Sequence, residues 1–156
     1  FSTTLRNNLT FDQPDATEED IIEALDMVGL TSLVAELSEG LDTFVGEGGR
    51  SLSGGQSQRV ALARAVLHRT CRVLVFDEPT AHLDIETEWE LKQRMLPLME
   101  GKLVFFATHR LHWLSEMDEI LLLENGQVEG FGSFDSLSEA NSFSYLANPR
   151  KEGGDE

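Results

Sequence analysis

Two short runs of apolar residues, each followed by polar residues, most constrain the fold of this chain. Val73 to Phe76 is apolar throughout and is followed by Asp77, Glu78 and a proline, and Leu103 to Thr108 is a second run that ends at His109. A continuous apolar run of this length is typical of a strand that is buried on both faces, as in a parallel sheet. The two runs therefore predict neighbouring buried strands of an α/β domain.

The rest of the sequence is mainly helical in pattern. Helices are expected at residues 17 to 28, 32 to 37, 53 to 69, 86 to 99, 111 to 117 and 134 to 147, with a further turn or two within residues 1 to 11. Residues 40 to 55 are expected to form a glycine-rich loop, and Asn125-Gly126 predicts a β-hairpin. This order of elements predicts an all-helical part followed by an α/β part with parallel strands.

Charge and cysteine content limit the classes of function. Among 156 residues, 12 are Lys or Arg and 28 are Asp or Glu, which gives a formal net charge of −16. A surface this acidic argues against a nucleic-acid partner, although backbone N–H groups or Mg²⁺ can still hold a phosphorylated ligand. Cys71 is the single cysteine, so a reducing compartment is expected. No apolar run approaches the roughly 18 to 20 residues that cross a bilayer.

Asp77 and Glu78 are the first candidates for chemistry. Carboxyl ends of parallel strands form the crevice in which α/β folds bind ligands. An apolar run that ends in Asp matches the strand that holds Mg²⁺ in phosphate-handling ATPases, and the adjacent Glu would orient or deprotonate the attacking water. His109, at the end of the next run, would reach the same crevice. Two solvent-facing acids and an ordinary surface histidine are the alternatives.

The stretch SLSGGQSQRVALARA, residues 51 to 65, places a serine and two glycines in front of a helix. Ser53 and Gln56 have the spacing of a capping box. Gly54 and Gly55 expose N–H groups at the positive end of the helix, where an anion can approach without obstruction. A plain capped helix is the alternative, but each glycine costs a helix about 1 kcal/mol relative to alanine. The stretch therefore predicts an anion-binding helix N-terminus.

These motifs together resemble those of the ATP-binding cassette (ABC) family. Leu52 to Gln56 resembles the signature motif, Val73 to Glu78 the Walker B strand with its catalytic glutamate, Thr80 to Asp84 the D-loop, and His109 the switch histidine. They occur in the family's order and at its spacing. Ala81-His82 departs from the Ser-Ala that is commoner in the D-loop, which leaves side-chain contacts there open.

The resemblance implies an α/β fold of the P-loop NTPase (ABC ATPase) class, with ATP and Mg²⁺ as cofactors. It implies that Asp77 binds the metal and that Glu78 and His109 are catalytic. The ATP-binding residues that it implies are Ser53, Gly54, Gly55, Gln56 and Asp84. It further implies a second ABC ATPase domain as partner, in a homo- or heterodimer, because the signature helix serves the nucleotide of the opposite domain.

A phosphate-binding loop needs Gly-x-x-x-x-Gly-Lys-Ser/Thr. The only Gly-Lys pair is Gly101-Lys102, and Leu96 and Leu103 occupy the positions of the first Gly and the Ser/Thr. The resemblance therefore implies a helical subdomain with the signature motif at residues 1–70, the second half of a RecA-like parallel-sheet core at 71–148 and a disordered tail at 149–156. The Walker A half is expected to be lacking, and the chain alone is expected to be inactive as an ATPase, unlike the full-length protein.

Thr43 to Arg50 is similar to the exporter segment that contacts the membrane domains, with Glu47 as the contact; an exposed acid in a glycine-rich loop is the alternative. The motifs look most like the branch of heterodimeric cysteine/glutathione exporters of CydC/CydD type, which serve cytochrome bd assembly. Lipid, peptide and multidrug exporters share most of them. The implied location is the cytoplasmic face of the cell membrane, with this segment itself soluble.

Three other classes carry related motifs. The net charge of −16 and the Glu47 loop argue against a soluble ABC-type ATPase of DNA repair. A translation-associated ABC protein would be expected to have basic ribosome-binding segments. A non-enzymatic regulatory module would not be expected to keep Asp77, Glu78 and His109 together.

Overall fold

The computed structural model describes residues 2–140 and Phe143. Its packing divides the chain into two units, Phe1–Ala107 and Thr108–Glu156. The predicted boundary at residue 70, between a helical subdomain and the second half of the core, is a different division and stays a prediction. The predicted tail at 149–156 lies outside the described residues. Within the described part of the chain, no helix combines the length and the apolar character that crossing a membrane requires.

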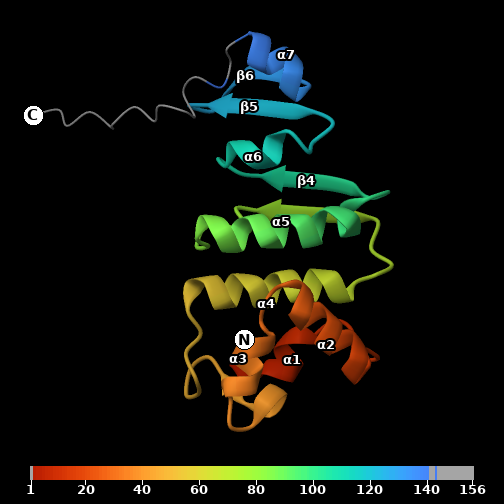
Figure 1. Ribbon diagram of the computed structural model, residues 1–156, viewed down its shortest axis with the longest axis vertical. Helices are drawn as coiled ribbons and strands as arrows, with labels where there is room; N and C mark the ends of the chain where they lie inside the picture. Colours follow the sequence, from red (N-terminus) through yellow and green to blue (C-terminus); the bar gives the residue numbers. More distant parts are fainter. Residues whose placement is uncertain (1, 141–142, 144–156) are drawn as a thin grey trace, which may run out of the picture. The chain divides into compact units, whose positions relative to one another are not determined.

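The first unit begins with a group of helices built around α4. The helices are α1 (Leu5–Leu9), α2 (Glu18–Met27), α3 (Thr31–Glu36), the 3₁₀ turn η1 (Gly40–Asp42) and α4 (Gly54–Leu67). Figure 1 shows α1, α2 and α3 gathered on one side of α4. The buried apolar side chains of this part of the chain include Leu5, Leu9, Ile21, Leu25, Leu30 and Val60. The helices predicted in this part of the sequence are confirmed to within a few residues.

Arginine side chains of α4 form hydrogen bonds to the backbone of the shorter helices. Arg64 Nε donates to the carbonyl of Asn8 at 2.8 Å, and Arg59 Nη1 donates to the carbonyl of Gly29 at 2.9 Å. Both carbonyls lie near a helix C-terminus, where the last carbonyls lack partners and the helix dipole favours a cation. The N-terminus of α2 is closed by a capping box between Thr17 and Asp20, at the start of the helix predicted from residue 17.

A small sheet in this part of the chain was not predicted. β1 (Thr3–Thr4) pairs with β2 (Phe44–Val45) in antiparallel register, and the Leu5 N–H donates to the Thr43 carbonyl at 2.9 Å. The expectations of an all-helical part and of a plain loop over residues 40–55 are therefore wrong at this point. Strands of two residues are too short to produce a periodicity in the sequence, and their pairing depends on residues 40 positions apart.

The first unit continues with a parallel pair of strands. β3 (Val73–Asp77) pairs with β4 (Leu103–Ala107), with Val73 opposite Leu103 and Asp77 opposite Ala107. The connection between them is α5 (Ile85–Met99), the crossover helix that a parallel pair requires. The prediction of parallel strands is confirmed. Pro97 lies inside the last turn of α5, and the helix ends two residues later.

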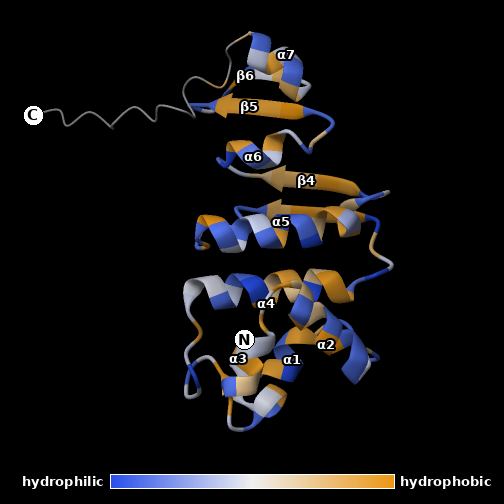
Figure 2. Cartoon of the chain, viewed as in Figure 1, coloured by the Kyte–Doolittle hydropathy of each residue, from blue (hydrophilic) through white to orange (hydrophobic). Residues whose placement is uncertain are grey.

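The prediction that both strands are buried on both faces is wrong. Leu74 and Phe76 of β3 are buried, whereas Val75 is 73% exposed and Phe105 of β4 is 57% exposed. Side chains of α4 and α5 lie beside Leu74 and Phe76, so helices cover this face of the sheet. Apolar residues occupy the opposite face as well, and Figure 2 accordingly shows most of β4 as hydrophobic. The sequence therefore could not reveal which face is covered.

The second unit is a hairpin with two short helices. It contains α6 (Leu111–Leu114), β5 (Ile120–Glu124), β6 (Gln127–Gly132) and α7 (Phe134–Glu139). Asn125 and Gly126 have φ values of 50° and 78°, which fit a tight hairpin turn with both central residues at positive φ, so the predicted hairpin is confirmed. Leu114, Ile120, Leu122 and Leu137 form its core. α6 is shorter than predicted, and most of the predicted helix beyond residue 140 lies outside the described residues.

Candidate functional site

The N-terminus of α4 is capped as the sequence predicted. Gln56 N–H donates to Ser53 Oγ at 3.2 Å, and Ser53 N–H donates to Gln56 Oε1 at 2.9 Å. These bonds engage Ser53 and Gln56 with each other, while Gly54 and Gly55 stand in the first turn, whose amides have no acceptor within the helix. The arrangement suits an anion at this end of the helix.

The two glycines also admit a neighbour from the same chain. A Cβ on Gly54 would lie 3.3 Å from Cδ2 of His82, and one on Gly55 would lie 3.2 Å from the His82 carbonyl oxygen. The segment after β3 therefore packs closely on the first turn of α4. Sequence reasoning missed this contact, because His82 is more than 25 positions away along the chain and no local pattern signals the approach.

Glu78 directly follows β3 and has an unusual backbone conformation. Its φ is 45°, in the left-handed region that non-glycine residues seldom adopt. Its N–H donates to the carbonyl of Ala107, the last residue of β4, at 2.9 Å, and its carbonyl accepts the Ala81 N–H at 3.2 Å. Such conformations persist where the surroundings determine them, and they cluster at functional sites.

Asp77 is the last residue of β3 and is exposed. It borders a hollow of about 200 Å³ that Gln58, Val75 and Pro79 also line. Among the described residues, no three His, Cys, Asp or Glu side chains gather as a metal site. Mg²⁺ in nucleotide sites needs only one or two carboxylates, because phosphates and water complete its coordination. A single exposed carboxylate at a strand end fits that role.

Asp84, which the family resemblance implies as an ATP contact, caps α5. Its Oδ1 accepts the Thr87 N–H at 3.0 Å and its Oδ2 accepts the Thr87 hydroxyl at 2.7 Å. The backbone and hydroxyl bonds from Thr87 stabilise the carboxylate and lower the pKa of Asp84. Its carboxylate therefore has a structural role, and contact with ATP stays a prediction.

His109 belongs to the second unit. It is exposed and follows β4 by two residues. Beside it, the Thr108 hydroxyl accepts the Arg110 N–H at 3.0 Å, which shapes the turn into α6. Its catalytic role stays a prediction that rests on its place in the sequence.

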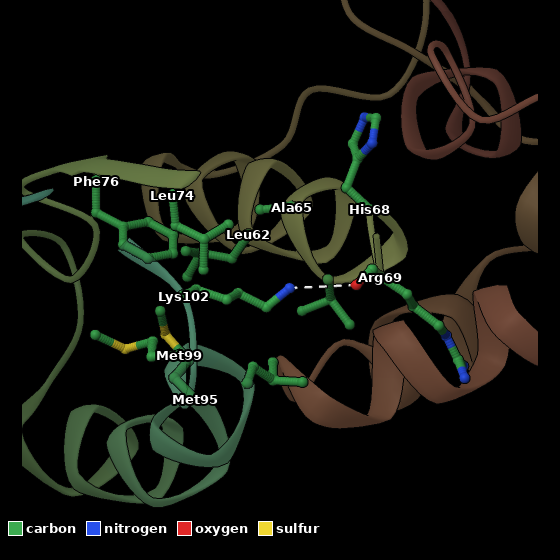
Figure 3. Close-up of a pocket in the computed structure, with 11 residues that line it drawn as sticks. Leu62, Ala65, His68, Arg69, Leu74, Phe76, Met95, Met99 and Lys102 are labelled. Atoms are coloured by element: carbon green, nitrogen blue, oxygen red, sulfur yellow. Dashed lines mark hydrogen bonds between the residues drawn. The ribbon is translucent and has the colours of Figure 1, made fainter. Parts of the chain in front are cut away.

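An apolar cavity of about 130 Å³ lies elsewhere in the first unit, between α4, β3 and α5. Figure 3 shows Leu62 and Ala65, Leu74 and Phe76, and Met95 and Met99 converging on it from these three elements. Lys102 extends along its edge and donates to the carbonyls of Arg69 at 3.2 Å and Cys71 at 2.6 Å. Most of the lining is apolar and the Lys102 ammonium is bonded to backbone carbonyls, so the cavity belongs to the packing between these elements.

Comparison with known proteins gives the family. Residues 2–81 match the family model described as ABC transporter. The chain belongs to the ABC transporter family. A solved structure, that of a bacterial Atm1-family ABC exporter with ATP bound, superposes with a TM-score of 0.81 at 30% identity; the match covers 100% of this chain and 27% of that one. The predicted fold, that of an ABC-type P-loop NTPase, is thereby confirmed.

Several ABC transporters are close in sequence. The chain is 56% identical over 141 residues to the glutathione/L-cysteine transport system ATP-binding/permease protein CydC of Bacillus subtilis, covering 90% of this chain and 25% of that protein. It is 44% identical over 128 residues to CydC of Escherichia coli, and this match covers 82% of this chain and 22% of that protein. It is 37% identical over 137 residues to the cyclolysin secretion/processing ATP-binding protein CyaB of Bordetella pertussis, and this match covers 88% of this chain and 19% of that protein. The chain spans about a quarter or less of the length of these relatives.

Proposed function

We propose that the chain is part of the nucleotide-binding domain of an ABC exporter that couples ATP binding and hydrolysis to the transport of thiols such as cysteine or glutathione. The observation that carries the proposal is the 56% identity to a CydC protein along 90% of this chain. Relatives named for cyclolysin secretion and glucan export match at 37% and 38%. The thiol exporter is therefore favoured over a peptide, lipid or multidrug exporter.

In this proposal the end of β3 performs the chemistry. Bound Mg²⁺ would neutralise the charge of the β- and γ-phosphates. Asp77 would hold it with an exposed carboxylate. Glu78 would orient the attacking water and take its proton, since its backbone is fixed on both sides by hydrogen bonds to Ala107 and Ala81. His109 would contact the γ-phosphate.

The N-terminus of α4 would serve a second nucleotide. Gly54 and Gly55, with Ser53 and Gln56 beside them, would present N–H groups to the phosphates of an ATP held by a second ABC ATPase domain. Glu47 is exposed, and its N–H donates to Ser2 Oγ at 3.0 Å. Its carboxylate would contact membrane domains at the cytoplasmic face. Closure of two domains around ATP and reopening after hydrolysis would bias the membrane domains between two states.

A substitution in the complete transporter tests the proposal. Glu78→Gln keeps the shape of the side chain and removes the proton acceptor, so ATP turnover should fall by at least about a hundredfold while ATP still binds. Asp77→Asn should in addition raise the Mg²⁺ concentration needed for activity. Glu90→Gln on the exposed side of α5 is the matched control. Ordinary turnover of Glu78→Gln would exclude Glu78 as the catalytic group.

The transported substrate needs its own measurement. Transporter reconstituted in vesicles should show ATP turnover that rises with cysteine or glutathione and not with an unrelated peptide. The reverse pattern would replace the thiol exporter with a peptide exporter and leave the role of Glu78 intact.

A further inference from the structure

One side chain of α4 bridges the two ends of the turn that follows β3. Gln58 Nε2 donates to the carbonyl of Glu78 at 3.0 Å, and Gln58 Oε1 accepts the N–H of His82 at 3.3 Å. Both halves of the amide are thus engaged with backbone of the Glu78–His82 segment. The fit requires an amide, because a donor and an acceptor must be presented side by side.

The location of Gln58 on the helix explains why it reaches this segment. Gln58 follows Gly54 by four residues, which is about one turn, so the two residues share a face of α4. That face is the one that packs on His82, through the close approach at Gly54 and Gly55. Gln58 is partly buried, so its bonds compete less with water than those of a fully exposed side chain.

Glu78 needs such a partner because its backbone is strained. A φ of 45° is unfavourable for residues other than glycine, so the surroundings must hold it. The Ala107 carbonyl fixes the N–H side of Glu78, and Gln58 is the side chain that fixes its carbonyl side. The Ala81 N–H donates to the same carbonyl at the longer distance of 3.2 Å. Loss of the shorter Gln58 bond would therefore weaken the hold on this carbonyl and would let the carboxylate shift.

We propose that Gln58 is a positioning residue for ATP hydrolysis: it holds Glu78 in its productive orientation from the signature helix. This inference rests on the proposed function, because it takes Glu78 as the catalytic base. It also ties α4, whose N-terminus faces the nucleotide of the partner domain, to the residue that acts on this chain's own nucleotide. Gln58 thus links the two sites.

The test compares three variants of the complete transporter. Gln58→Leu removes both hydrogen bonds, and Gln58→Glu keeps the shape and the acceptor for His82 but removes the donor to Glu78. Gln93→Leu makes the same substitution on the exposed side of α5 and serves as the matched control. Both Gln58 variants should lower kcat by about tenfold or more with the KM for ATP within about twofold, because a misplaced base affects the transition state and not the binding of ATP.

Two further readouts separate positioning from simple loss of stability. In a Glu78→Gln background, Gln58→Leu should cause no further loss of residual turnover, since residues that act as a unit are not additive. Amide hydrogen exchange of the peptide that contains His82 should speed up in Gln58→Leu and stay unchanged in Gln93→Leu. Thermal melting controls for folding. If Gln58→Leu melts at a lower temperature than Gln93→Leu, the kcat of the isosteric Gln58→Glu decides whether Gln58 positions Glu78.

The outcomes distinguish this inference from the proposed function. If Glu78→Gln abolishes turnover and both Gln58 variants behave like Gln93→Leu, Gln58 does not position the base and the inference is overturned. If Glu78→Gln retains turnover, the proposed function has failed at Glu78 itself, and the inference falls with it. A kcat loss at Gln58 that adds fully to that of Glu78→Gln would also overturn it.

Discussion

The hydroxyl of Thr80 donates a hydrogen bond to the carboxylate of Glu88 at 2.5 Å, and both residues are fully buried. The bond joins the turn after β3 to the first turns of α5. Gln58 holds the same turn from the side of α4. The turn after β3 is therefore held by two different helices, and its buried bond from Thr80 to Glu88 should contribute to stability more than to chemistry.

Thr80→Val tests this interior bond. Valine keeps the shape and removes the donor to a buried carboxylate, so the free energy of unfolding should fall by about 1–3 kcal/mol. Thr31→Val at the exposed start of α3 is the control and should change it little. Urea denaturation of both variants makes the comparison. Equal stability of the two variants would show that the Thr80 bond is not needed by the fold.

The glycines of α4 give a second prediction. In the complete transporter, Gly54→Ala should abolish ATP-dependent closure if the glycine admits a phosphate. The His82 ring would be only 3.3 Å from the new Cβ, so crowding by His82 is a competing cause of any loss. Gly54→Ala combined with His82→Ala removes that crowding, and turnover should stay low.

His82→Ala alone is the control for this pair, with thermal melting as the check on folding. Recovery of turnover in the double variant would mean that Gly54 serves the fit of His82 and not the approach of a phosphate. Gly55 is less suited to this test, because its neighbour is the His82 backbone carbonyl, which truncating the histidine side chain does not remove.

A third prediction concerns the chain of 156 residues by itself. Its sequence contains no Gly-x-x-x-x-Gly-Lys-Ser/Thr, the motif that supplies the lysine and many backbone contacts to the phosphates. The purified chain should therefore release no phosphate from ATP above the background of the assay. Turnover at a rate typical of the family would contradict this and would require a different phosphate-binding element.

The pair of Asp12 and His68 predicts a pH dependence of stability. His68 Nε2 lies 2.5 Å from Asp12 Oδ2, and this hydrogen bond lowers the pKa of Asp12. A carboxylate whose pKa is lower in the folded state stabilises the fold at neutral pH, and this contribution is lost as pH falls below about 4, through the folded-state pKa. The pair is partly exposed, so the effect should be less than about 1 kcal/mol.

Asp12→Asn should therefore lower the urea midpoint near neutral pH, and the difference from the unchanged protein should shrink near pH 3. Asp15→Asn on the same exposed loop is the control. A difference that stays constant over this range would mean that the charge of Asp12 is not what stabilises the pair.

Local patterns predicted much of this fold and of the candidate site. The capping boxes at Thr17 and Ser53 and the hairpin at Asn125 each depend on residues within a few positions, so the sequence displays them directly. The bridge from Gln58 to Glu78 and the pairing of β1 with β2 join residues 20 and about 40 positions apart. No short pattern encodes such contacts. A resemblance to a family identifies the motifs but not the residues that pack against them from elsewhere in the chain.

The backbone of Glu78 has a consequence for how this chain can change. At a φ of 45° glycine would be the easier residue, so Glu78→Gly should relieve strain at this turn. Under the proposed function the same change removes the proton acceptor. Selection for thermal stability alone could therefore favour Glu78→Gly, and the resulting variant would no longer hydrolyse ATP. Under the proposed function the carboxylate at this position lowers stability and supports activity, so a screen that measures melting alone would select against ATP hydrolysis.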